Sequence, residues 1–202
     1  MKHAIGDREP SRVADCRFWT VARLSIMPTS VARRADPERS YVTMESPIGT
    51  LTLVATTVGL SELWFDKPAA REVQRAIGRP SPRNPILVDS AHQLRDYFGA
   101  KRRHFDIPLD LSGTEFQQRA WLALLDIPFG ETRTYAEHAV RIGHPRAIRA
   151  VGAANGRNPI AIVVPCHRLV GSDGSLTGFG GGLPAKDWLL SLEREGRPRP
   201  AL

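Results

Sequence analysis

The sequence predicts an α+β protein, in which a small N-terminal α/β sheet domain precedes a mostly helical C-terminal domain with a winged-helix-like helix-turn-helix. Two observations support this order. Short segments of alternating apolar and polar residues lie in the first half, and two helix-capping patterns followed by apolar residues at helical spacing lie in the second. No apolar run approaches the roughly 18 residues that cross a bilayer, so we expect a cytoplasmic protein without membrane contact.

The chain of 202 residues divides into four segments. Residues 1–39 mix Arg, Asp, Pro and Ser without a sustained period, so we expect a disordered extension, or residues that precede the true start of the protein. An N-terminal α+β domain is expected over 40–112 and a C-terminal domain over 113–196. Residues 197–202 form a tail.

The N-terminal domain begins with three short strands. In the stretch YVTMESPIGTLTLVATTVGLSELWFD, apolar residues alternate with threonine from Leu51 to Ala55, and Gly49 and Gly59 mark turns. This pattern predicts a small antiparallel sheet. Helical spacing follows over 68–77 and 85–100, and HFDIPLD resembles a last strand.

Capping signals predict the helices of the C-terminal domain. Thr114 and Gln117 form a capping box ahead of FQQRAWLALLDI, and Thr134 and Glu137 form another, so that a helix begins near Tyr135. For the next helix, HPRAIRAVGAANG places Pro145 at the first helical position and Asn155-Gly156 just past the end.

Two short helices joined by a Gly-His turn have the form of a helix-turn-helix, although a generic helical hairpin has the same spacing. Charge favours the first interpretation. The net charge is +7, and residues 131–170 carry six Arg against two Glu. Arg149 lies on the second helix, where a helix that docks on DNA carries basic residues.

Of the two cysteines, Cys16 and Cys166, neither belongs to a cluster with metal-ligand spacing, so we predict no metal site and no disulfide framework. Cys166 follows the apolar run IAIVV, which we interpret as a buried strand that ends at Pro165 because proline cannot continue the ladder. The cysteine is then either inert packing or a nucleophile at the mouth of a pocket.

A nucleophilic cysteine needs a base or a positive field, because only a few per cent of an ordinary thiol is ionised at neutral pH. His167 is the next residue, and it could contact Cys166 only if the strand breaks or a water intervenes. Glu193, on the last helix, is the candidate acidic partner of His167. Gly180, Gly181 and Gly182 form either a phosphate cradle or, as we favour, a backbone that lies against a flat ligand.

The stretches TRTYAEHAVRIGHPRAIRAVGAANGRNPIAIVV and PCHRLVGSDGSLTGFGGGLPAKDWLLSLE resemble the O6-alkylguanine-DNA alkyltransferases, also called methylated-DNA–protein-cysteine methyltransferases. The resemblance is dense over 114–195 and weaker over 41–113. It implies a monomer that needs no cofactor. Such a protein binds double-stranded DNA that contains O6-alkylguanine, flips the damaged base, and transfers the alkyl group irreversibly to its own cysteine; O4-alkylthymine is a further expected substrate.

The resemblance also implies roles for single residues. Cys166 accepts the alkyl group, His167 takes the thiol proton through a water, and Glu193 orients His167. Asn158 braces this network, and Tyr135 donates a proton to the departing guanine.

For DNA, the resemblance implies that Arg149 fills the gap left by the extruded nucleotide. Further expected DNA contacts are Thr134, Ala150, Ala154, Gly156 and Arg168, and the expected pocket residues are Val164, Pro165, Phe179 and Gly180. Phe179 stands where several relatives have tyrosine, so we expect an altered alkyl preference. A DNA-binding regulator without chemistry and a cysteine hydrolase are the alternatives.

Overall fold

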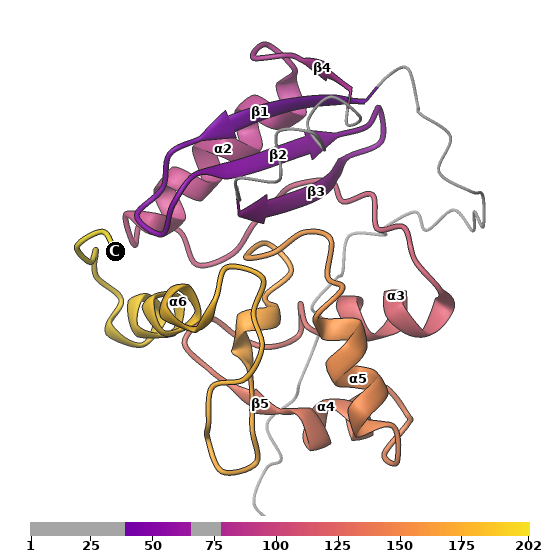
Figure 1. Ribbon diagram of the computed structural model, residues 1–202. Coiled ribbons are helices and arrows are strands. Elements are labelled where there is room, and N and C mark those ends of the chain that lie inside the picture. Colours follow the sequence, from indigo (N-terminus) through magenta and orange to yellow (C-terminus); the bar gives the residue numbers. More distant parts are fainter. Residues whose placement is uncertain (1–38, 66–77) are drawn as a thin grey trace, which may run out of the picture.

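The computed structural model describes residues 39–65 and 78–202. The extension predicted over 1–39, apart from Arg39, lies outside these residues, as do Cys16 and the helix predicted over 68–77. Within the described residues, a twisted sheet backed by one helix stands beside a second, mostly helical unit (Figure 1). The predicted fold class is confirmed.

The sheet consists of three antiparallel strands and one short parallel strand. Strands β1 (Ser40–Met44), β2 (Leu51–Ala55) and β3 (Leu60–Phe65) pair in sequence, as the alternation predicts. The two-residue strand β4 (Arg79–Pro80), which the sequence analysis missed, pairs in parallel with β1, so that the order is β3-β2-β1-β4. A proline is tolerated there because β4 is an edge strand.

Helix α2 (Pro85–Phe98) covers one face of the sheet (Figure 1). It begins after Asn84, whose side chain accepts hydrogen bonds from the backbone N–H groups of Ile86 and Leu87. The strand predicted at HFDIPLD does not form: only a single bridge joins Leu109 to Leu60. Pro108 lacks an N–H, so it offers only its carbonyl to the Leu60 N–H, at 2.8 Å.

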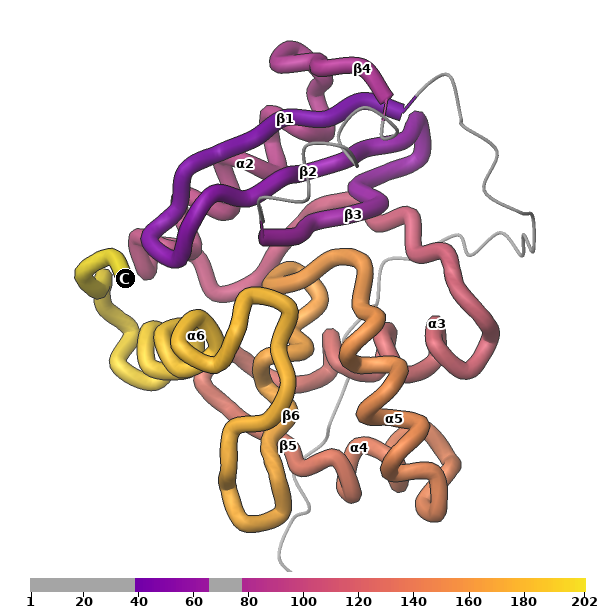
Figure 2. The backbone as a smooth tube through the Cα atoms, in the orientation of Figure 1, coloured from indigo at the N-terminus to yellow at the C-terminus, as the bar shows by residue number. Residues whose placement is uncertain are grey.

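The second unit places short helices around a two-stranded pair (Figure 2). Its elements are α3 (Glu115–Leu122), β5 (Arg133–Thr134), α4 (Tyr135–Arg141), α5 (Ile148–Asn155), the 3-10 turn η1 (Cys166–Arg168), β6 (Leu169–Val170) and α6 (Leu183–Glu195). Both predicted capping boxes form, at the starts of α3 and α4. Strands β5 and β6 pair in parallel beside the helix-turn-helix, in the position of a small wing.

The second helix of the helix-turn-helix begins later than predicted. Pro145 lies in a turn closed by the Ala147 N–H on the His144 carbonyl, and α5 begins at Ile148. Asn155 is the last residue of α5, not a residue past its end. Gly143, at φ +79°, turns the chain sharply after α4, and four further residues complete the reversal before helical geometry can start.

The strand predicted over IAIVV is also wrong. In the part of the chain that the structure describes, Ile160 alone of this run pairs with a strand, through a bridge to Leu63 of β3, and the chain then turns at Ile162, where φ is +72°. The Val163 and Val164 N–H groups bond to carbonyls two and four residues earlier. The run is apolar because it is buried, and a short apolar run predicts burial without specifying the backbone conformation.

One apolar core joins the two units. Buried residues of β2, β3 and α2 belong to the same cluster as those of α3, α5, α6 and the segment 160–164. Backbone hydrogen bonds cross between the units as well, from Leu63 N–H to the Pro159 carbonyl and from Ala161 N–H to the Leu63 carbonyl. Among the described residues no helix combines the length and apolar character needed to cross a membrane.

Trp121 positions the helix-turn-helix, because its indole N–H donates to the Ala154 carbonyl of α5 at 2.8 Å within the core. In Trp121→Phe, this carbonyl loses the indole donor but keeps the Arg157 N–H at 3.0 Å, so we expect the free energy of unfolding to fall by about 1 kcal/mol, the net contribution of one hydrogen bond. Urea denaturation measures the change. Trp64→Phe, at a half-buried position of β3, is the control and should change stability by less; equal losses in both variants would contradict the role of this hydrogen bond.

Candidate active site

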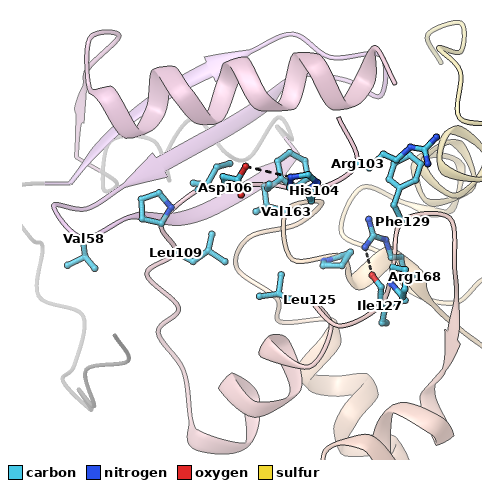
Figure 3. Close-up of a pocket in the computed structure, with 15 residues that line it drawn as sticks. Val58, Arg103, His104, Asp106, Leu109, Leu125, Ile127, Phe129, Val163 and Arg168 are labelled. Carbon is cyan, nitrogen blue, oxygen red and sulfur yellow. Dashed lines mark hydrogen bonds and ion pairs between the residues drawn. The ribbon is translucent and has the colours of Figure 1, made fainter. Parts of the chain in front are cut away.

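A hollow of about 720 Å³ lies between the loop over 103–109 and the segments 125–129 and 163–168 (Figure 3). Pro165 and Arg168 line it, with the exposed side chains of Val58 and Leu125 at its rim. Cys166 is not among its lining residues. Pro165 was predicted to line the substrate pocket, and the structure places it instead on this opposite side of the reactive segment.

A second hollow, of about 650 Å³, contains the sulfur. Six predicted site residues line it: Tyr135, Arg149, Gly156, Cys166, Phe179 and Gly180. They come from the starts of α4 and α5, the end of α5, the turn η1 and the glycine-rich loop before α6. Cys166 is 4% exposed, so its sulfur lies at the inner end of a pocket whose mouth is formed by the helix-turn-helix.

The turn η1 explains how Cys166 and His167 can belong to one site. In an extended strand, neighbouring side chains point to opposite faces. Here Cys166, His167 and Arg168 form a 3-10 turn directly after Pro165, which breaks that alternation. The break at Pro165 was predicted, but the helical turn was not.

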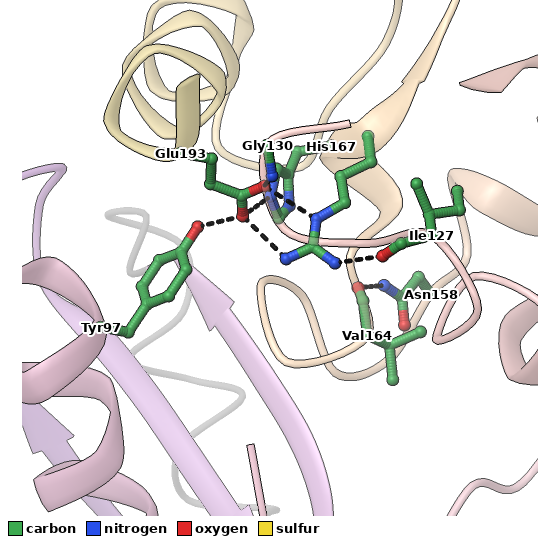
Figure 4. Close-up of polar contacts among 8 residues, drawn as sticks. Tyr97, Ile127, Gly130, Asn158, Val164, His167 and Glu193 are labelled. Atoms are coloured by element: carbon green, nitrogen blue, oxygen red, sulfur yellow. Dashed lines mark hydrogen bonds and ion pairs between the residues drawn. The ribbon is translucent and has the colours of Figure 1, made fainter. Parts of the chain in front are cut away.

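The Glu193 carboxylate lies at the centre of a buried network (Figure 4). Its Oε1 atom lies 2.9 Å from His167 Nε2 and accepts from the Tyr97 hydroxyl at 2.7 Å. Arg168 donates to both carboxylate oxygens, each at 2.9 Å, and the Gly130 N–H donates to Oε2 at 3.1 Å. The pairing of His167 with Glu193 agrees with the predicted relay, whereas Tyr97, Gly130 and the position of Arg168 were not foreseen.

These contacts set the charges of the network. Burial raises the pKa of Glu193, but the hydrogen bonds that His167 and Arg168 donate, together with the positive charge of Arg168, outweigh it and hold that pKa well below its usual range. Burial lowers the pKa of His167, with Arg168 and Lys186 acting in the same direction and Glu193 opposing them. The guanidinium of Arg168 therefore balances an ionised Glu193, and His167 is a neutral imidazole at neutral pH.

The neutral His167 has a defined tautomer. An ionised carboxylate can only accept, so the Nε2 atom that contacts Glu193 carries the proton. Nδ1 is buried and has no hydrogen-bond partner among the described residues, so its lone pair is available to take a proton. A neutral histidine with this tautomer is competent as a base.

Cys166 is a thiol in the resting protein. Burial raises its pKa, although hydrogen bonding from Asn158 and the positive charge of Lys186 act in the opposite direction. Lys186 is fully buried and donates to the Leu169 and Thr177 carbonyls. The sequence analysis missed it, but a signal existed: Lys186, Leu189 and Glu193 share one face of a predicted helix, and a lysine on an apolar face is unusual.

The Tyr135 hydroxyl lies among polar groups at the pocket wall. It accepts from Asn155 Nδ2 at 3.4 Å and from the Thr177 hydroxyl at 3.2 Å. Asn155 also donates to the Cys166 carbonyl at 3.3 Å, while its Oδ1 atom is buried without a hydrogen-bond partner among the described residues. The sequence analysis used Asn155 only to predict the end of a helix and did not predict a place in the site.

Asn158 braces the backbone that carries the cysteine. Its Nδ2 atom donates to the Val164 carbonyl at 2.8 Å, and its Oδ1 atom accepts from the Ile160 N–H at 3.1 Å. Both bonds hold the tight turn before Pro165, and Figure 4 shows the one to Val164. Val164 is fully buried and does not line the pocket, contrary to the prediction.

Two residues predicted to contact DNA lie in the interior. Ala154 is 2% exposed, because its side chain faces the core between α5 and α3. Arg168 is buried, and its three guanidinium nitrogens bond to Glu193 and to the Ile127 carbonyl. The prediction that these two residues contact DNA is wrong for their side chains, which are buried. Arg149, Ala150 and Gly156 are exposed on or next to α5, and Thr134 is the half-buried cap of α4.

Replacing Glu193 with Gln leaves Arg168 buried without its counter-charge, so we expect the free energy of unfolding at neutral pH to fall by about 3–5 kcal/mol. Because the native pKa of Glu193 lies below the unfolded value of about 4.3, the carboxylate contributes fully above that pH and progressively less below it. Urea denaturation from about pH 7 to about pH 3 should show a steeper acid loss in the wild type than in Glu193→Gln. Equal slopes would contradict this charge assignment.

Comparisons with known proteins agree with this geometry. The DNA-binding domain of 6-O-methylguanine DNA methyltransferase matches residues 115–195, and the ribonuclease-like domain of the same family matches 40–111. A methylated-DNA–protein-cysteine methyltransferase of Mycolicibacterium paratuberculosis is 51% identical over 158 residues, which are 78% of this chain and 94% of the relative. A methylated-DNA–protein-cysteine methyltransferase of Methanosarcina barkeri is 49% identical over 156 residues, which are 76% of this chain and 96% of the relative.

Solved structures give the same result. A crystal structure of Mycobacterium tuberculosis OGT in complex with DNA superposes with a TM-score of 0.72 at 48% identity, and it covers 79% of this chain and 95% of the relative. A crystal structure of M. tuberculosis O6-methylguanine methyltransferase superposes with a TM-score of 0.69 at 47% identity, and it covers 79% of this chain and 95% of the relative. The chain therefore belongs to the methylated-DNA–protein-cysteine methyltransferases, a family of DNA repair enzymes.

Proposed function

We propose that the protein removes alkyl groups from the O6 atom of guanine in double-stranded DNA by transferring them, once and irreversibly, to Cys166. One observation carries the proposal: a single pocket holds the cysteine at its inner end, beside a neutral histidine paired with a buried carboxylate, and opens at a helix-turn-helix. The M. tuberculosis relative that crystallised with DNA supports the choice of partner.

The depth of Cys166 requires the damaged base to leave the duplex. The O6 atom of a stacked guanine cannot approach a sulfur that is 4% exposed at the end of a pocket. Extrusion costs a few kcal/mol, and least for a damaged, poorly paired base. Arg149 is exposed beside the pocket mouth near the N-terminus of α5, and we assign it to the gap that the extruded nucleotide leaves.

The transfer is a substitution at the alkyl carbon. A sulfur–carbon bond forms as the bond between carbon and O6 breaks, and the thiol proton moves through a water to Nδ1 of His167. Glu193 then stabilises the imidazolium through Nε2. Tyr135 lies in the pocket wall and donates a proton to the departing guanine. The tyrosinate that this leaves regains a proton from the imidazolium of His167 by way of solvent, so the net result moves one proton from sulfur to guanine.

The same chemistry suits the O4-alkyl group of thymine, which is a smaller base with an equivalent ether oxygen. No cofactor enters the scheme, because the nucleophile, the base and the acid are all side chains. A protein that depends on one free thiol is suited to a reducing compartment, and we propose that it acts in the cytoplasm as a monomer.

Incubation of the full chain with a duplex that contains one O6-methylguanine tests the proposal. Intact mass spectrometry should show a gain of one methyl group per protein, with the modification on a peptide that contains Cys166. Cys166→Ala should bind the duplex and gain nothing, whereas Cys16→Ala, which removes the other cysteine of the chain, should gain the methyl group normally. Repeated turnover would indicate a hydrolase, and DNA binding without modification would indicate a regulator.

Arg149→Ala tests the extrusion step. Because filling the gap offsets part of the cost of unstacking, we expect transfer from duplex DNA to slow about 10- to 100-fold. Transfer from a short single strand, which has no stacked partner to replace, should slow far less. Single-turnover kinetics on both substrates measure the difference, with Arg119→Ala on α3 as a control of equal charge change. Equal slowing on both substrates would contradict the assignment.

A further inference from the structure

Phe65 connects the sheet to the wall of the pocket. It is the last residue of β3, and its ring meets the ring of Phe179 edge-on, with centroids 5.4 Å apart and planes at 74°. The Phe179 ring in turn lies edge-on to the ring of His167, at 6.2 Å. Phe179 lines the pocket together with Cys166. Three neighbouring rings, those of Phe65, Phe179 and His167, therefore connect the N-terminal sheet to the histidine next to Cys166.

Gly181 provides a second contact between Phe65 and the same loop. A Cβ atom placed on Gly181 would lie 2.6–2.7 Å from three carbons of the Phe65 ring. The loop backbone thus lies directly against the ring. Phe65 holds the loop at two points, through the Phe179 ring and through the Gly181 backbone.

Within the described residues, further interactions of this loop come from the C-terminal unit. Lys186 Nζ holds the Thr177 carbonyl at 2.7 Å, and the Gly182 N–H bonds to the Phe179 carbonyl at 3.0 Å. Gly178 and Gly180 are exposed and carry no side chain that could pack. The position of the Phe179 ring, and with it the width of the pocket above Cys166, is therefore sensitive to Phe65.

We propose that Phe65 is a positioning residue that sets which alkyl groups the pocket accepts, by holding Phe179 close to Cys166 and so favouring small groups over bulky ones. The inference rests on the proposed transfer to Cys166. Shortening Phe65 opens space behind Phe179, into which that ring can move. A methyl group gains no contacts from the added space, whereas a benzyl group occupies it.

The test compares single-turnover transfer of methyl and of benzyl groups from O6 of guanine in the same duplex. In Phe65→Ala we expect the benzyl-to-methyl rate ratio to rise about tenfold, the scale on which pocket contacts discriminate hydrophobic groups. Phe65→Leu, which keeps more of the packing, should raise the ratio less and guards against loss of folding. An unchanged ratio in both variants would overturn the proposal.

Phe98→Leu is the matched control. Phe98 also joins the two units, through an edge-on contact with Trp188 at 5.9 Å, but it does not line the pocket. Phe98→Leu should lower the free energy of unfolding and leave the benzyl-to-methyl rate ratio unchanged. If the ratio shifts as it does in Phe65→Ala, the change comes from weakened packing between the two units in general, and the proposal is overturned.

Gly181→Ala gives an independent check. In the wild type the new methyl group collides with the Phe65 ring and displaces the loop, so the rate ratio should change; in the Phe65→Ala background the collision is absent and the added effect should vanish. An effect that persists there would contradict the contact. A wild-type protein that accepts neither alkyl group would refute the proposed function and this inference together, whereas normal transfer with unmoved ratios refutes the inference alone.

Discussion

The buried carboxylate of Glu193 is the interaction on which the rest of the site depends. An ionised carboxylate is stable in the interior only when hydrogen bonds and a counter-charge replace water. Five donors from three segments do so here: the Tyr97 hydroxyl, His167 Nε2, two nitrogens of Arg168 and the Gly130 N–H. Each donor has to be in place, so the carboxylate fixes the relative positions of α2, the loop before β5, the turn η1 and α6.

The same carboxylate separates two chemical roles within the turn η1. Arg168 supplies the permanent positive charge, which leaves His167 neutral and able to accept a proton. The thiol of Cys166 is protonated in its buried setting and gains its reactivity only when a base removes the proton. Three adjacent residues therefore have different roles: Cys166 reacts, His167 accepts a proton and Arg168 balances the charge of Glu193.

Local signals in the sequence were reliable where the structure depends on neighbouring residues. Thr114 and Thr134 cap the helices that their patterns predict, and the alternation from Leu51 to Ala55 marks a strand. Predictions failed where the structure depends on contacts between residues that are far apart in the sequence. The run at 160–164 is apolar because both units cover it, and Arg168 resembles a surface charge until Glu193, 25 residues away, is placed beside it. Tyr97 lies 96 residues from its carboxylate partner, and no local pattern could connect them.

The continuous core has a consequence for how the protein tolerates sequence change. Over 39–65 and 78–112, the described part of the N-terminal unit, no residue lines the pocket that contains Cys166, yet apolar side chains of this part belong to the same cluster as that cysteine. Disruption of the sheet is therefore expected to weaken the packing of the reactive half as well. Substitutions in the sheet, although distant from the bound nucleotide, are then constrained by the apolar contacts that support the reactive cysteine.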